Sequence, residues 1–153
     1  MHKLIVKEVK NYERWIINLK DRDKVCYQLD IVKEEVEKLQ GVSSLCFLPY
    51  SYAIEVTVLI DHTKRIESVL RVFCKHFGKI RVRNVVPENK CFKFFFSGDI
   101  RLEIGLTGES CKRVIVGSKE VKVDIYELRC DNGEEKAVTD IEISKELIEE
   151  PEG

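Results

Sequence analysis

The sequence predicts an α+β fold, with an N-terminal helical hairpin and one further helix packed on a mostly antiparallel sheet of about six strands. Three observations predict it. Apolar residues recur every three or four positions in residues 8–40, which indicates two helices. Apolar and polar residues alternate over most of residues 44–60 and 79–125, which indicates strands. Helical spacing returns once, in residues 64–77.

Two helices open the chain. The first covers residues 8–20 and has an apolar stripe of Val9, Tyr12, Ile16 and Leu19, with Trp15 beside it. After a break at residues 21–23, the second covers residues 24–40 and ends before Gly41. Its apolar seam consists of Val25, Leu29, Val32, Val36 and Leu39. We expect the pair to pack on the sheet as a hairpin, and a coiled-coil dimer seam is the alternative.

The middle of the chain reads as strand, helix and strand. Residues 44–60 predict two strands around a turn at Pro49-Tyr50-Ser51. A helix over 64–77 ends at Gly78, and a strand follows over 79–86. The unit 53–86 is compatible with a βαβ crossover, whose flanking strands would run parallel.

Two hairpins follow. In the first, Phe92, Phe94 and Phe96 should face Ile104, Leu102 and Ile100 across a turn at residues 97–99. In the second, Gly117-Ser118 suits a two-residue type II′ turn, because glycine takes the positive φ without steric cost. That turn would place Val114 opposite Val121 and Cys111 opposite Asp124.

Length and composition point to one soluble domain. With 153 residues, of which 44% are hydrophobic, the chain can bury a core, and we expect a single domain over 1–148 with a frayed acidic tail at 149–153. The longest apolar runs are too short to span a bilayer or to form a secretory signal, which favours a cytoplasmic location and no membrane partner. The six cysteines lack Cys-x-x-Cys spacing, so we expect reduced, largely buried thiols and no metal site.

Charge is distributed unevenly along the chain. Residues 62–101 contain ten Lys and Arg against three Asp and Glu, a net charge of +7. Residues 131–153 contain nine Asp and Glu against two Lys, a net charge of −7. Such blocks indicate either a tail that shields the basic segment or two surfaces for different partners.

The basic segment supplies candidate nucleic-acid contacts. If its strands are neighbours, one face of the sheet would display cations around an exposed phenylalanine, a combination that binds phosphates and stacks bases. The candidate residues are Lys79, Arg81, Arg83, Lys93, Phe95 and Arg101.

Catalytic chemistry has no recognisable signature. His76 follows Cys74 by two positions, so the two would leave a helix in different directions, and no glycine-rich phosphate loop is present. We therefore expect no catalytic residue and no cofactor. The favoured class is a small non-enzymatic protein that binds another protein, with Tyr50 and Tyr52 as candidate interface residues. Homo-oligomerisation through an edge strand or through the seam of helix 24–40 is compatible with the sequence.

One segment resembles a known group of proteins. The stretch Cys111–Cys130, with Val-Gly-Ser-Lys at 116–119, is similar to segments of small uncharacterised proteins of tailed bacteriophages, and it covers about 20 of 153 residues. In those proteins a Val-Gly-Ser/Thr-Lys hairpin tip also lies between two cysteines. The resemblance implies a phage-encoded protein that acts on a host protein in the bacterial cytoplasm, as an inhibitor or an accessory factor. Binding of nucleic acid or nucleotide by the 79–101 surface is the alternative.

Overall fold

The computed structural model describes residues 1–88, 91–108, 111–118, 124–130 and 143–149. For residues 82–88, 111–113, 115–118 and 124–130 it describes the backbone alone. The elements in chain order are α1 (Lys3–Asp21), α2 (Asp23–Glu37), β1 (Val42–Pro49), β2 (Ile54–Ile60), the 3₁₀ turn η1 (Thr63–Arg65), α3 (Ile66–Phe77), β3 (Val82–Glu88), β4 (Cys91–Phe96), β5 (Ile100–Leu106), β6 (Cys111–Ser118), β7 (Asp124–Cys130) and the 3₁₀ turn η2 (Lys145–Leu147). The α+β class is thus confirmed.

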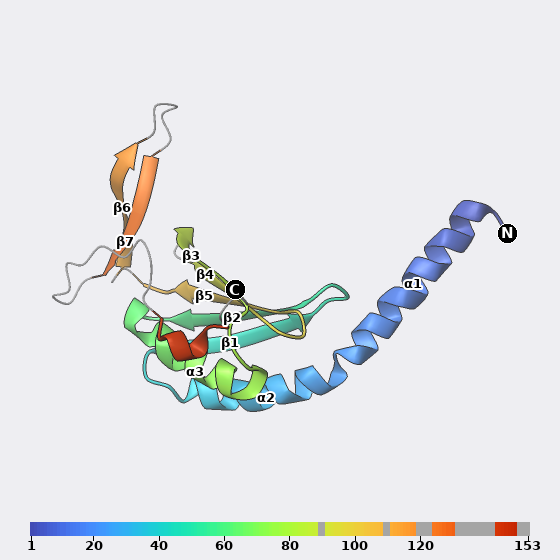
Figure 1. The fold of residues 1–153 in the computed structure, drawn as a ribbon, viewed down its shortest axis with the longest axis horizontal. Coiled ribbons are helices and arrows are strands. Elements are labelled where there is room, and N and C mark those ends of the chain that lie inside the picture. Colours follow the sequence, from blue (N-terminus) through green and yellow to red (C-terminus); the bar gives the residue numbers. More distant parts are fainter. Residues whose placement is uncertain (89–90, 109–110, 119–123, 131–142, 150–153) are drawn as a thin grey trace.

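A five-stranded mixed sheet, in the order β1-β2-β5-β4-β3, organises the body of the molecule (Figure 1). β2 pairs with β5 in parallel, and the other three pairings are antiparallel. Strands β6 and β7 form a separate two-stranded sheet, so the expected single sheet of about six strands is replaced by five plus two.

The βαβ unit has its expected parallel strands, although they are not neighbours. The pairings make β2 parallel to β5 and β5 antiparallel to β4, which is in turn antiparallel to β3. β2 and β3 therefore point the same way, and the connection through α3 crosses over two strands. The two strands in between are the β4–β5 hairpin, which follows β3 in the chain and fills the centre of the sheet.

The hairpin of β4 and β5 has the register that the sequence predicts. Phe92, Phe94 and Phe96 lie opposite Ile104, Leu102 and Ile100, and all six side chains are buried. Asp99 in the connecting turn has a φ of 58°, a left-handed conformation that Asp tolerates better than most residues. Three phenylalanines on one face can thus fix the pairing, because a slip of one residue would expose all of them.

The predicted register of the second hairpin is wrong. Val114 lies opposite Glu127, and Cys111 lies opposite Cys130 rather than Asp124. Gly117 does not form the turn. It pairs with Ile125 beside a register shift, where the absence of a side chain suits a bulge. Residues 119–123, which include the predicted partner Val121, lie outside the described part of the chain.

The core lies between one face of the five-stranded sheet and the helices α2 and α3 (Figure 1). Inward residues alternate along β2, as the period of a half-buried strand requires. The seam of α2 contributes Leu29, Val32 and Val36, each fully buried. The sheet of the same chain thus covers this seam, as expected, and excludes the alternative of an oligomer contact through the seam of helix 24–40.

The predicted N-terminal helical hairpin is also wrong. α1 begins five residues earlier than expected and extends away from the body (Figure 1). None of its residues is buried. Arg22, the single residue between α1 and α2, has φ −82° and ψ −9°, which is close to helical geometry. The chain therefore bends there instead of reversing, whereas a helical hairpin needs a loop of about 2–5 residues.

The C-terminal segment returns to the body beside α3. Ile143 and Leu147 are buried in the core, and Ile148 forms a parallel bridge with Ile80. The N–H of Glu149 donates to the carbonyl of Ile80 at 3.0 Å, so the chain is held as far as the start of the expected frayed tail. Residues 150–153 lie outside the described part.

Candidate functional site

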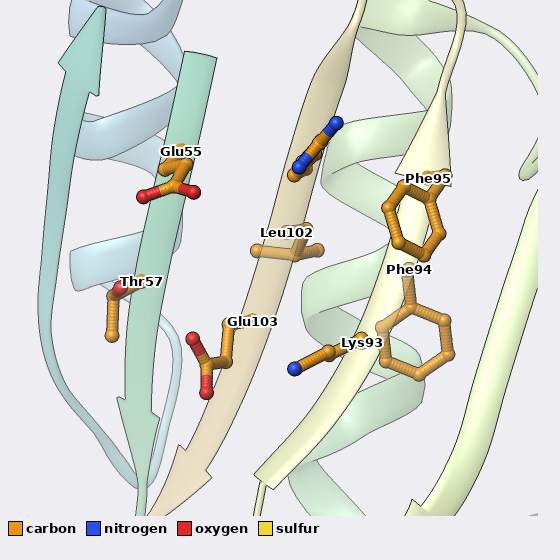
Figure 2. Close-up of a pocket in the computed structure, with 8 residues that line it drawn as sticks. Glu55, Thr57, Lys93, Phe94, Phe95, Leu102 and Glu103 are labelled. Carbon is orange, nitrogen blue, oxygen red and sulfur yellow. The ribbon is translucent and has the colours of Figure 1, made fainter. Parts of the chain in front are cut away.

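The sheet face opposite α2 and α3 carries a small hollow of about 180 Å³. Figure 2 shows that its side chains come from the neighbouring strands β2, β5 and β4. The residues that line it are Glu55, Thr57, Lys93, Phe94, Phe95, Arg101, Leu102 and Glu103. Three of the predicted nucleic-acid contacts, namely Lys93, Phe95 and Arg101, are thus brought together on this open face.

The charges in the hollow are balanced. Arg101 lies opposite Glu55 in the β2–β5 pairing, and Lys93 lies opposite Glu103 in the β4–β5 pairing. The side chains of Lys93 and Glu103 point toward one another (Figure 2). The face is therefore a pattern of alternating charge rather than the basic surface that the net charge of residues 62–101 suggested. Glu103 lies on β5, the strand of Arg101, and Glu55 lies on the neighbouring strand β2.

A stack of two tyrosines and one arginine borders the hollow. The rings of Tyr50 and Tyr52 lie 5.3 Å apart and are parallel to within 8°. The guanidinium of Arg101 lies 5.3 Å from the centre of the Tyr52 ring, a cation–π contact. Partial burial, the Glu55 carboxylate and Tyr50 raise the pKa of Tyr52, so its hydroxyl remains a donor at neutral pH. The predicted protein-interface residues and one predicted nucleic-acid contact thus form one surface.

Arg22 anchors the turn that carries this stack. Its guanidinium donates to the carbonyls of Ser51 at 3.4 Å and Gly98 at 3.1 Å, and it lies 3.3 Å from the Asp99 carboxylate. Ser51 stands between the two tyrosines, so the base of α1 is tied to the stack and to the β4–β5 turn. Sequence reasoning treated Arg22 only as part of a helix break, because its acceptors lie 29 to 77 residues away.

The other predicted basic residues lie elsewhere. Lys79 and Arg81 border a second hollow, together with Phe77, Ser97 and Glu149. Arg81 forms an ion pair with Glu149 at 3.6 Å, and Arg71 forms one with Glu146 at 2.6 Å. The backbone of Arg83 belongs to β3, but its side chain is outside the described residues. The C-terminal segment therefore pairs with the basic segment, as the shielding alternative predicts.

The environments of Cys74 and Cys91 do not activate these thiols as nucleophiles. Burial, together with a hydrogen bond to Glu103 and its charge, raises the pKa of Cys91 to about 11. The Cys74 thiol donates to the carbonyl of Leu147, whereas His76 contacts Glu35 at 3.0 Å. These two side chains have separate partners and do not form a nucleophile–base pair. Cys26, Cys46, Cys74 and Cys91 are free.

Within the described ranges, no group of three or more His, Cys, Asp and Glu side chains is arranged to hold a metal ion. In the same part of the chain, no helix is long and apolar enough to cross a membrane. No family model, curated protein or solved structure matches this chain. The geometry of the open face and of α1 is therefore the basis on which function is inferred.

Proposed function

We propose that this chain is a small non-enzymatic binding protein that engages another protein through the open sheet face, with the Tyr50–Tyr52–Arg101 stack as its anchor. The stack is the observation that carries the proposal. Tyrosine and arginine are enriched among the residues that dominate protein–protein binding, since they offer large contact areas and a hydrogen-bonding tip. Here they form a preorganised unit that loses little side-chain freedom on binding.

Charge supports a polypeptide as the occupant of this face. The hollow contributes two cations and two carboxylates in alternation. A polypeptide segment with charges of both signs complements such a pattern, whereas a polyphosphate would meet Glu55 and Glu103. Because Cys111–Cys130 resembles segments of phage proteins, we further propose that the partner is a bacterial host protein and that binding occurs in the host cytoplasm.

The test begins with capture of partners from bacterial lysate on the tagged protein, with and without nuclease. The affinity of the captured partner for purified variants is then measured by calorimetry. Tyr52→Ala should weaken binding by about 30-fold, the effect of losing a hot-spot residue of about 2 kcal/mol. Tyr27→Ala is the matched control, because Tyr27 is 68% exposed on α2, away from the hollow. Equal affinities of the two variants for the partner would refute the proposed anchor.

Nucleic acid is the second candidate ligand. The observation in its favour is that Lys93, Phe95 and Arg101 line one hollow and that Arg101 also contacts the exposed Tyr52 ring, so that cations and aromatic faces are neighbours. Fluorescence anisotropy with a labelled single-stranded oligonucleotide tests it. Phosphate binding should weaken steeply between about 50 and 200 mM salt and be lost in the Lys93→Ala/Arg101→Ala variant. Binding that is insensitive to salt would exclude this candidate.

A further inference from the structure

Within the described part of the chain, no element covers the apolar face of α1. Ile5 is 52% exposed, Tyr12 63% and Ile16 45%, and none of the 19 residues of the helix is buried. In proteins, most of the stability of a helix comes from packing of its apolar face rather than from intrinsic helix propensity. The exposed side chains of α1 thus form an apolar face for which the body of the molecule provides no cover (Figure 1).

The spacing on this face is that of a coiled coil. Its central stripe consists of Ile5, Val9, Tyr12, Ile16 and Leu19, at successive separations of four, three, four and three residues. This is the alternation of d and a positions with which one helix packs against another. Lys3, Lys7, Lys10 and Arg14 fall on the opposite side of the helix, where they remain in water. The pattern therefore favours another helix as the occupant.

We propose that α1 pairs with the α1 helix of a second copy of this chain in an antiparallel dimer. A helix of 19 residues is about 28 Å long. When two such helices overlap along most of their length in opposite directions, the two bodies lie at opposite ends of the pair and do not collide. In this register Ile5 packs against Ile16 of the second copy, and Val9 packs against Tyr12 of the second copy.

The flanking charges favour the antiparallel direction. A parallel pair would place Glu8, at a g position, beside Glu13 of the second copy, at an e position, and like charges there destabilise the pair. The antiparallel register instead places Glu8 beside Trp15 and Glu13 beside Val6 of the second copy. No like-charged pair is then formed along the seam.

The size of the contact sets the expected strength. A face about 28 Å long and about 10 Å wide is smaller than the roughly 800 Å² that each partner buries in a stable complex. The dimer should therefore dissociate on dilution. Sedimentation velocity over a concentration series, from low micromolar to several hundred micromolar, should show a monomer that converts to a dimer.

Two substitutions test the direction of pairing. Ile5→Glu and Ile16→Lys should each weaken dimerisation by about tenfold or more, because each buries an unpaired charge in the seam. The double variant should recover much of the affinity, since in the antiparallel dimer each introduced carboxylate faces an introduced ammonium. In a parallel dimer the same double variant would juxtapose like charges and stay monomeric. Asn11→Glu, on the polar side of the same helix, should dimerise like the unmodified chain.

Other outcomes would overturn the proposal. A chain that stays monomeric at several hundred micromolar does not pair through α1, and a dimer unaffected by the single variants uses a different surface. Cosedimentation of the monomer with phosphatidylcholine–phosphatidylglycerol vesicles, lost in Ile16→Lys, would assign α1 to a lipid surface instead. Urea unfolding of each variant supplies the folding control, because α1 contributes nothing to the buried core.

Discussion

At the scale of single residues, the body of the molecule is held by a few long-range polar contacts. Arg22 joins the base of α1 to the β1–β2 and β4–β5 turns, and its side chain is only 14% exposed. Glu35 on α2 similarly contacts Lys75 and His76 on α3. In both cases one charged group serves two or more partners, which orients whole elements without adding to the core.

The raised pKa of Cys91 predicts a slow, strongly pH-dependent thiol. Because the thiolate is the nucleophile, a pKa of about 11 leaves Cys91 almost fully protonated at pH 7.5. Its alkylation by iodoacetamide, followed by peptide mass spectrometry, should be slower than that of exposed Cys46 and should rise about tenfold per pH unit toward pH 11. Glu103→Gln should accelerate the reaction, since it removes the negative charge beside the thiol. Equal rates at Cys46 and Cys91 at pH 7.5 would contradict the burial and the contact with Glu103.

At the scale of elements, the consecutive helices α1 and α2 have different roles. Both are amphipathic, but only α2 packs its stripe on the sheet. The near-helical geometry of Arg22 directs α1 outward, so its stripe remains available to another molecule. The stability of the fold therefore depends on α2 and not on α1.

Two leucine-to-alanine substitutions separate these roles. Leu29→Ala should lower the free energy of unfolding by about 2–5 kcal/mol, because it leaves a cavity at a fully buried position of α2. Leu4→Ala, at a 67% exposed position of α1, should change it by less than about 0.5 kcal/mol. Urea denaturation at low micromolar concentration, where α1 is unpaired, measures both. A comparable loss in Leu4→Ala would mean that α1 packs on the body in solution.

At the scale of the whole molecule, ion pairs between distant elements make stability depend on pH. Hydrogen bonds from Lys75 and His76 lower the pKa of Glu35 below its usual 4.5. A carboxyl whose pKa is lower in the folded state stabilises the fold above its unfolded pKa, and this contribution is lost as the pH falls through the folded value.

Glu35→Gln should therefore be less stable than the unmodified chain at pH 7, and the difference should shrink as the pH falls below 4.5. Chemical denaturation across this pH range measures the effect. Glu34→Gln is the matched control, because Glu34 is the neighbouring, exposed carboxylate on the same helix. A difference that stays constant with pH would show that Glu35 acts through packing rather than through its charge.

The periodicity of apolar residues correctly predicted those strands whose pairing is set by which side chains are buried. The period of two in Phe92, Phe94 and Phe96 determined both the strand and its pairing with β5, because only one register buries all three rings. The same reasoning failed for β6 and β7. There a bulge at Gly117 shifted the register. Glycine is favoured both in hairpin turns and in bulges, so the residue type alone does not distinguish the two.

By itself, the sequence determined the α+β class, the three helices and most strands, since periodicity reports which side of an element is apolar. It also indicated Tyr50, Tyr52 and the cations of residues 79–101 as exposed groups. Only the tertiary structure decided that α1 extends outward, that Glu55 and Glu103 neutralise the open face, and that Arg101 stacks on Tyr52. The physical reason is that periodicity shows which face of an element is apolar or charged, but not which other element packs against that face. The packing partner is set by strand order and by contacts between residues far apart in the chain.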